Sequence, residues 1–302
     1  MCGIVGLFAK SPEIERDLGR HVAAMLGQMS DRGPDSAGVA IYREPVAAGS
    51  SKLVLQHPDL GHDWESLAAD LARTFGGEPS LERRGNHAVL VVAAEADETE
   101  PYVRRNHPGV RVMSAGSVIE IYKEVGRPET FIERFKLAEL SGTHALGHPR
   151  MATESKVTTE GSHPFSTGLD LCLVHNGSLS NHGPLRRLLQ RRGIEFQSLN
   201  DTEVAAGYLT WRMREGADLR TAMEGCLEDL DGFYTFAVGS AEGFAVLRDP
   251  IACKPAVMAE NDDWVAMASE YRAIAVLPGA ASARSWEPAP ATVYAWEREP
   301  VA

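Results

Sequence analysis

Hydrophobic residues recur along the chain with two different periods, which predicts a protein of mixed helices and strands. The apolar run from Ile4 to Phe8 is typical of a buried strand. Apolar residues then recur at helical spacing through residues 11–33, which predicts an amphipathic helix with Ser11 as its cap and Pro12 in its first turn. Chain ends are usually mobile, but this one is expected to pack into the core.

The rest of the pattern predicts further helices and many short strands, divided by glycine, proline and asparagine. Helices are expected at residues 63–75, 128–135, 184–193, 201–216 and 217–230. Strands are expected at residues 38–43, 87–96, 110–116, 117–126, 143–148, 171–177, 232–240, 243–249, 256–261, 264–270 and 291–297. With strands in both halves and helices grouped between them, we expect one layered α+β domain over residues 1–302.

Composition narrows the choice of partners and of compartment. The 302 residues carry 42 acidic against 30 basic side chains, a net charge of −12, which argues against nucleic acid or an anionic membrane as a partner. No stretch approaches the roughly 18 apolar residues of a membrane-spanning helix, and no signal peptide is apparent. We therefore expect a cytoplasmic protein.

Cysteine and histidine spacing predicts neither a disulfide framework nor a metal site. The four cysteines are far apart and form no CxxC pair, and disulfides are rare in a reducing compartment. Cys172, Cys226 and Cys253 are interpreted as small buried side chains. His144 and His148 lie four apart in a predicted strand, where that spacing does not make a helical metal-binding face.

Cys2 is the first candidate for chemistry. Removal of Met1 would leave Cys2 with a free α-amine, whose ordinary pKa of about 7.7–8.0 lies near the value of about 8.5 for a thiol. Such an amine can accept the thiol proton and return it to a leaving amine, so the residue can serve as nucleophile and base together. Taken alone, a cysteine at position two is more often an incidental small residue.

Polar residues that follow predicted strands supply the other groups that a cysteine nucleophile needs. Arg150 can hold a carboxylate through its guanidinium fork, and Thr153 is near enough to add a hydroxyl. Asn176 and Gly177 offer the donor types of an oxyanion hole. Asp201 can hold an amino group, so that Arg150 and Asp201 would recognise both charged ends of an α-amino acid. Taken separately, the sequence His-Asn-Gly is often a turn, and Asn-Asp-Thr-Glu is a good helix N-cap with a capping box.

Read in order, these motifs resemble the class II glutamine amidotransferases. The segments MCGIVGLF, RGPDSAG, GHPRMATES, HPF, HNG, NDTE, DGFYTFAV, RDPIACKP and ASE carry the resemblance. It implies a four-layer αββα N-terminal-nucleophile fold that hydrolyses glutamine to glutamate and ammonia. Cys2 is the implied nucleophile, Asn176 and Gly177 the oxyanion hole, and Arg150, Thr153 and Asp201 the substrate ligands. Arg32 is expected to help fix Cys2.

The chain departs from the family at two places. Many relatives have Trp-Ala-Thr-His-Gly after the arginine, whereas this chain has Met151 to Ser155, which alters the loop beside the carboxylate site. About 46–140 is expected to be an insertion, with a docking surface and a plain elaboration of the sheet edges as equal interpretations.

The finer resemblance is to the small amidotransferase-like subunit of N-methylglutamate synthase, a relative of glutamate synthase. It rests on RMATES, VTTEG, HPFSTG and CLVHNGSLSNH together with the insertion. It implies glutamate-synthase-like partner subunits that carry FMN, with an iron–sulfur cluster as a further option, and no cofactor in this chain. The net reaction of that enzyme, methylamine and glutamate to N-methylglutamate and ammonia, consumes no glutamine.

Three alternatives therefore stay open at this point. The chain is a catalytic glutaminase subunit of that complex or of another amidotransferase, or a structural or glutamate-sensing subunit, or a hydrolase that acts alone on another amide. The pairing of Arg150 with Asp201 argues against the last, because it suits a free amino acid.

Overall fold

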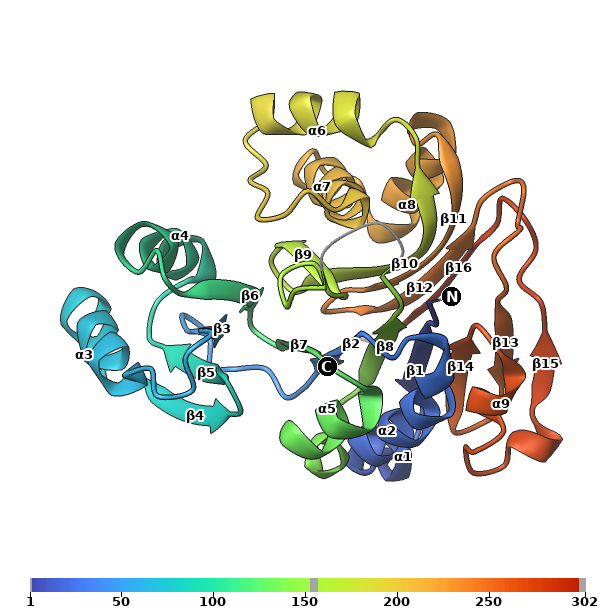
Figure 1. Cartoon of the computed structure of the whole chain (residues 1–302), viewed down its shortest axis with the longest axis horizontal. Coiled ribbons are helices and arrows are strands. Elements are labelled where there is room, and N and C mark those ends of the chain that lie inside the picture. The colour runs from blue at the N-terminus through green and yellow to red at the C-terminus, as the bar shows by residue number, and fades with distance from the viewer. Residues whose placement is uncertain (1, 153–156, 299–302) are drawn as a thin grey trace.

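A computed structural model describes residues 2–152 and 157–298, and two stacked sheets form its centre (Figure 1). The first sheet has seven strands, in the order β15 (Arg284–Trp286), β13 (Val257–Glu260), β14 (Trp264–Ala268), β1 (Val5–Ala9), β8 (His144–Arg150), β2 (Ser36–Tyr42) and β7 (Ile119–Val125). The second has five, in the order β16 (Val293–Glu297), β12 (Gly243–Arg248), β11 (Gly232–Gly239), β10 (Leu171–Leu179) and β9 (Phe165–Gly168).

Helices cover the outer face of each sheet, which gives the four layers that the family resemblance implies (Figure 1). Those on the seven-stranded sheet are α1 (Pro12–Arg16), α2 (Leu18–Gln28), α5 (Pro128–Arg134) and α9 (Tyr271–Ile274). Those on the five-stranded sheet are α6 (His182–Arg191), α7 (Asp201–Arg214) and α8 (Leu219–Asp229). Short 3-10 turns are η1 (Ser30–Arg32), η2 (Leu137–Glu139) and η3 (Ala280–Ser282).

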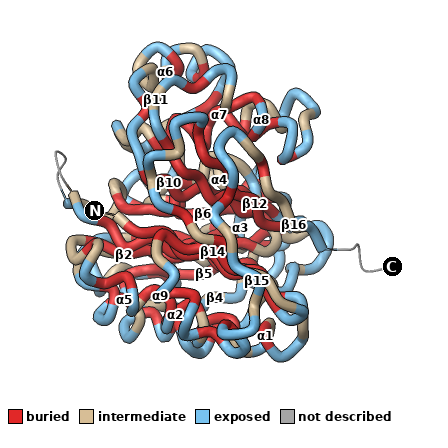
Figure 2. The backbone as a smooth tube through the Cα atoms, turned by 90° about the vertical axis from the view of Figure 1, so that its right-hand side faces the viewer, coloured by how far each residue is buried: buried red, intermediate tan, exposed pale blue. Residues whose placement is uncertain are grey.

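The two faces of the five-stranded sheet belong to different cores because side chains alternate along a strand. Cys172 and Val174 on β10 point toward the seven-stranded sheet and join the core between the sheets. Leu171 and Leu173 point the other way and pack against α6, α7 and α8. In Figure 2 the backbone of the central strands is coloured mostly as buried, and the exposed segments lie at the periphery.

Part of the predicted insertion forms a third sheet beside the main body (Figure 1). Its strand order is β4 (Ser80–Arg84), β5 (His87–Val92), β3 (Ser51–Gln56) and β6 (Arg111–Gly116), and α3 (Trp64–Phe75) and α4 (Ala96–Asn106) complete its own core. Val54, Val89 and Met113 face the other way and join the hydrophobic core of the main body. The later part of the insertion, β7 and α5, belongs to the main body.

Most predicted elements are present, with several corrections. The helix expected over residues 11–33 is interrupted at Asp17, and Ser11 precedes it without a side-chain capping bond. The strand expected over 87–96 ends at Val92, and its last residues lead into α4. Cys253 is exposed, whereas Cys172 and Cys226 are buried as expected. In the described part of the chain, no helix is long and apolar enough to cross a membrane.

Candidate active site

The backbone around Cys2 is fixed by three separate segments of the chain. β1 lies inside its sheet, paired with β14 on one side and β8 on the other. The N–H of Gly3 donates to the Pro149 carbonyl at 3.1 Å, and Ile4 exchanges hydrogen bonds with Ser269 at 2.9 and 3.0 Å. The backbone that follows Cys2 is therefore held in place, and the half-buried Cys2 thiol donates to the Met151 carbonyl at 3.4 Å.

Arg32 bonds directly to the candidate nucleophile. Its Nε donates to the Cys2 carbonyl at 3.1 Å, and its guanidinium is ion-paired with Glu270. Glu270 also pairs with Arg272, at 2.6 Å. The hydrogen bond from Arg32, with a smaller contribution from Arg272, lowers the pKa of Glu270, so this carboxylate stays charged and balances Arg32.

Asn176, on strand β10 of the five-stranded sheet, lies beside Cys2. It is buried on β10, and its Nδ2 donates to the Ser269 hydroxyl at 3.1 Å and, more weakly, to the Cys2 carbonyl at 3.4 Å. Ser269 therefore ties the amide of Asn176 to the backbone of Ile4. The next residue, Gly177, has φ of +150°, and a Cβ there would lie 2.0 Å from the Phe233 carbonyl oxygen, so glycine is required.

Asp201 opens helix α7, where the helix N-terminus favours a negative charge. Its Oδ2 accepts the N–H of Leu179 at 2.9 Å. Asn200 caps the helix by accepting the N–H of Thr202 at 2.9 Å, as the sequence predicts. Glu203 does not complete the expected capping box. Its carboxylate instead accepts the N–H groups of residues 197 and 198 at 2.7 and 2.8 Å, and so holds the loop before the helix.

Three buried histidines lie behind these residues. The rings of His148 and His163 stack at 4.0 Å, and the hydroxyl of Thr202 lies 2.9 Å from His163 Nε2 and 3.0 Å from His175 Nδ1. Burial lowers the pKa of all three, to about 3 for His148, so they are neutral at physiological pH. His148 Nε2 lies 3.1 Å from the carbonyl of His175. Because a carbonyl only accepts, the Nε2 of His148 carries the proton.

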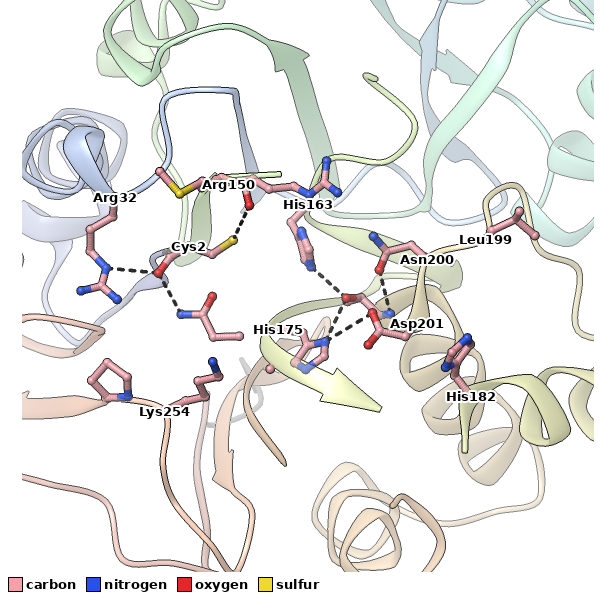
Figure 3. A pocket seen from close by; sticks show the side chains of 15 residues that line it. Cys2, Arg32, Arg150, His163, His175, His182, Leu199, Asn200, Asp201 and Lys254 are labelled. Atoms are coloured by element: carbon pink, nitrogen blue, oxygen red, sulfur yellow. Dashed lines mark hydrogen bonds and ion pairs between the residues drawn. The ribbon is translucent and has the colours of Figure 1, made fainter. Parts of the chain in front are cut away.

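These groups surround one cavity of about 420 Å³ (Figure 3). Its lining includes six of the seven predicted site residues: Cys2, Arg32, Arg150, Asn176, Gly177 and Asp201. The seventh, Thr153, lies outside the described residues. In Figure 3, Arg150 and Cys2 lie on one side of the cavity, and Asp201 lies at the end of a helix across from them.

Sequence reasoning assigned no role to several residues around the cavity. The cavity is also lined by His163, His175 and Lys254. Two further residues position lining residues: Ser269 accepts a hydrogen bond from Asn176, and Glu270 forms an ion pair with Arg32. All five belong to segments that the resemblance already singled out, namely HPF, HNG, RDPIACKP and ASE. Over residues 2–152 and 157–298, no three His, Cys, Asp or Glu side chains are arranged to hold a metal ion.

Stacked sheets between helices, with the first residues of the chain at a polar cavity, form the architecture of the N-terminal-nucleophile fold. Comparison with solved structures agrees. Glutamine phosphoribosylpyrophosphate amidotransferase from B. subtilis superposes with a TM-score of 0.60 at 19% identity, over 98% of this chain and 49% of that one. At that identity the likeness shows the fold alone.

Sequence comparison identifies the family. A glutamine amidotransferase domain family matches residues 148–276. A "glutamine amidotransferase-like protein GlxB" from Rhizobium meliloti is 53% identical over the full length of both chains. A "putative glutamine amidotransferase" from Methanothermobacter thermautotrophicus is 32% identical over 89% of this chain and 92% of its own. The chain belongs to the class II glutamine amidotransferase family.

Proposed function

We propose that this chain hydrolyses glutamine to glutamate and ammonia, with Cys2 as its nucleophile. One observation carries the proposal: Cys2, Asn176, Arg150 and Asp201 line the same cavity, although 199 positions separate the first from the last. Arg150 binds the α-carboxylate of the substrate and Asp201 its α-ammonium group. Both charged ends of the amino acid are then held, which directs its side-chain amide toward the thiol.

The chemistry follows from these positions in two halves. With Met1 removed, the α-amine of Cys2 takes the thiol proton and the sulfur attacks the γ-carbonyl carbon. The oxygen becomes negative and is held by Asn176 Nδ2 and the N–H of Gly177, each such donor supplying roughly 2.7–4 kcal/mol. The amine returns its proton to the departing ammonia, which leaves a thioester. Water, deprotonated by the same amine, hydrolyses the thioester to glutamate and the free thiol.

The surroundings of Asn176 support this use of its amide. Its stronger hydrogen bond goes to Ser269 at 3.1 Å, and its weaker one goes to the Cys2 carbonyl at 3.4 Å. In the reaction the oxyanion replaces the weaker partner while Ser269 keeps the amide in place. The site therefore needs little reorganisation when charge develops.

The proposal is tested by glutamine hydrolysis with the purified full chain. Cys2→Ala should release no ammonia above background, whereas Cys253→Ala, which removes an exposed thiol that does not line the cavity, should keep activity. Intact mass of the active preparation should show that Met1 is absent. Normal turnover by Cys2→Ala, or full activity with Met1 retained, would refute the mechanism.

At a finer level, the chain serves as the amidotransferase-like subunit of a cytoplasmic N-methylglutamate synthase. The support is the resemblance of RMATES, VTTEG, HPFSTG and CLVHNGSLSNH to that subunit. Glutamate-synthase-like partner subunits then carry FMN, with an iron–sulfur cluster as a further option. Glutaminase subunits of other amidotransferases, and a structural or glutamate-sensing subunit of the same complex, are the alternatives.

Purification of the native complex separates these alternatives. The assay compares methylamine plus glutamate with glutamine plus 2-oxoglutarate as substrates. Formation of N-methylglutamate supports the assignment to N-methylglutamate synthase. Formation of glutamate alone refutes that assignment and leaves the glutaminase proposal standing. If Cys2→Ala assembles into the complex and leaves N-methylglutamate synthesis unchanged, the structural or sensing role is favoured.

A further inference from the structure

Lys254 brings a positive charge to the substrate cavity that glutamine recognition does not use. Its side chain reaches the cavity from the side opposite Arg150 (Figure 3). Its ammonium lies 5.0 Å from the centre of the Phe233 ring, and within the described residues no carboxylate lies at ion-pair distance from it. Burial is the main cause of the lowered pKa of His175, and the charge of Lys254 lowers that pKa slightly further.

The loop before Lys254 is built to hold that side chain in place. The buried guanidinium of Arg248 donates to the carbonyls of Ala252 and Lys254, the latter at 3.0 Å. The fully buried carboxylate of Asp249 accepts the N–H groups of Ile251 and Ala252 at 3.2 and 3.0 Å. Ala252 takes a left-handed conformation, with φ of +52°. The buried side chains of Arg248 and Asp249 thus fix the strained turn at Ala252, and this turn directs the Lys254 ammonium group toward the cavity.

The charged groups of the cavity can be compared with those of an amino-acid ligand, and this comparison indicates which group Lys254 binds. The α-carboxylate and α-ammonium of an amino acid are matched by Arg150 and Asp201, and Arg32 is balanced by Glu270. The charge of Lys254 is therefore left for the side-chain end of the ligand. Glutamine ends in a neutral amide, which gains little from a full positive charge, whereas glutamate ends in a carboxylate, which gains a charge-assisted hydrogen bond.

We propose that Lys254 binds the γ-carboxylate of glutamate and makes this cavity a glutamate-retaining site. The inference rests on the proposed function, because it uses the same amino-acid orientation, and it deepens that function by naming the ligand that the resting site prefers. Glutamate formed from glutamine stays bound until it is displaced, and glutamate from solution occupies the same position without any turnover.

The test measures the binding of L-glutamate and of L-glutamine by calorimetry. The full-length Cys2→Ala protein serves as parent, because it cannot turn glutamine over during the titration. Lys254→Met and Lys254→Arg are added to this parent. Lys10→Met is the matched control, since Lys10 follows the far end of β1. Its removal loses one surface ion pair of 3.0 Å with Glu260 and one hydrogen bond of 2.8 Å to the Asn261 carbonyl.

We expect Lys254→Met to weaken glutamate binding about tenfold or more and to leave glutamine binding within about twofold. Lys254→Arg should restore most of the glutamate affinity, and Lys10→Met should change neither ligand. Equal weakening of both ligands, or unchanged glutamate binding in Lys254→Met, overturns the inference. If the Cys2→Ala parent binds neither amino acid, the proposed function itself fails, which is a different result from failure at Lys254 alone.

Discussion

Acid should unfold this protein through its buried neutral histidines. Burial lowers the pKa of His87, His144 and His148 from 6.5 to about 3, and it lowers those of His163 and His175 in the same direction. Well above pH 6.5 these rings are neutral in both the folded and the unfolded chain, so they do not lower the free energy of unfolding. As the pH falls from 6.5 toward 3, only the unfolded chain binds the protons, and stability is lost.

The size of the effect follows from the three histidines whose pKa is about 3. At pH 5 each ring would be protonated in the unfolded chain but not in the fold, which favours unfolding by ~2 kcal/mol per histidine. Together the three account for ~6 kcal/mol, and the other two add to that in the same direction. Because folded domains are stable by only about 5–15 kcal/mol, this loss is enough to bring the fold close to unfolding.

Urea denaturation at pH 7 and pH 5 measures this loss directly. In His144→Gln, the fall in the free energy of unfolding between the two pH values should be smaller than in the unmodified protein by ~2 kcal/mol. Tyr42→Phe is the control, because Tyr42 stacks on the His144 ring at 4.0 Å and its own raised pKa keeps it from titrating in this range. A pH-dependent fall in His144→Gln equal to that of Tyr42→Phe would refute the reasoning.

Gly177→Ala should reduce glutamine hydrolysis about a hundredfold or more, because the added carbon meets the Phe233 carbonyl and displaces the proposed oxyanion donors. Near-normal steady-state rates would contradict this. Asp170→Ala should lower the free energy of unfolding in urea by ~2–4 kcal/mol, because the Asp170 carboxylate accepts the backbone N–H groups and a hydroxyl of the β6–β7 turn. An unchanged urea midpoint would count against it. Glu270→Gln should lower kcat more than it changes KM, because Arg32 loses the charge that holds it on Cys2; a change in KM alone would point to a different role.

How much of the fold the sequence predicts depends on how strongly each element is patterned. The central strands of the two main sheets are buried on both faces, so they appear as uninterrupted apolar runs, as at residues 243–247. The third sheet gives a weaker signal. β4 is an exposed edge strand of polar residues, and α4 contains Pro101 and few apolar side chains. The stability of both comes from packing on the rest of that sheet, which no local pattern reports.

The predicted residues that line the cavity are ones where a polar side chain directly follows or interrupts an apolar strand. Arg150 and Asn176 end or interrupt such runs, and the fold brings them to the same cavity as Cys2. Lys254 gave no comparable signal, because its position depends on hydrogen bonds that a buried arginine and aspartate make within an irregular loop. The same loop exposes Cys253, against the expectation drawn from its apolar neighbours.

The central position of β1 explains how the start of a chain can carry precise chemistry. A terminal residue normally loses rigidity because nothing pairs with it on one side. Here the backbone from Cys2 to Ile4 is bonded to the Arg32 side chain, to Pro149 on β8 and to Ser269 after β14. Each of these bonds comes from a different part of the chain, so the fold must be complete before the thiol reaches its place. Ser269 also accepts a hydrogen bond from Asn176, so the same residue positions the strand that begins beside the proposed nucleophile and the proposed oxyanion donor.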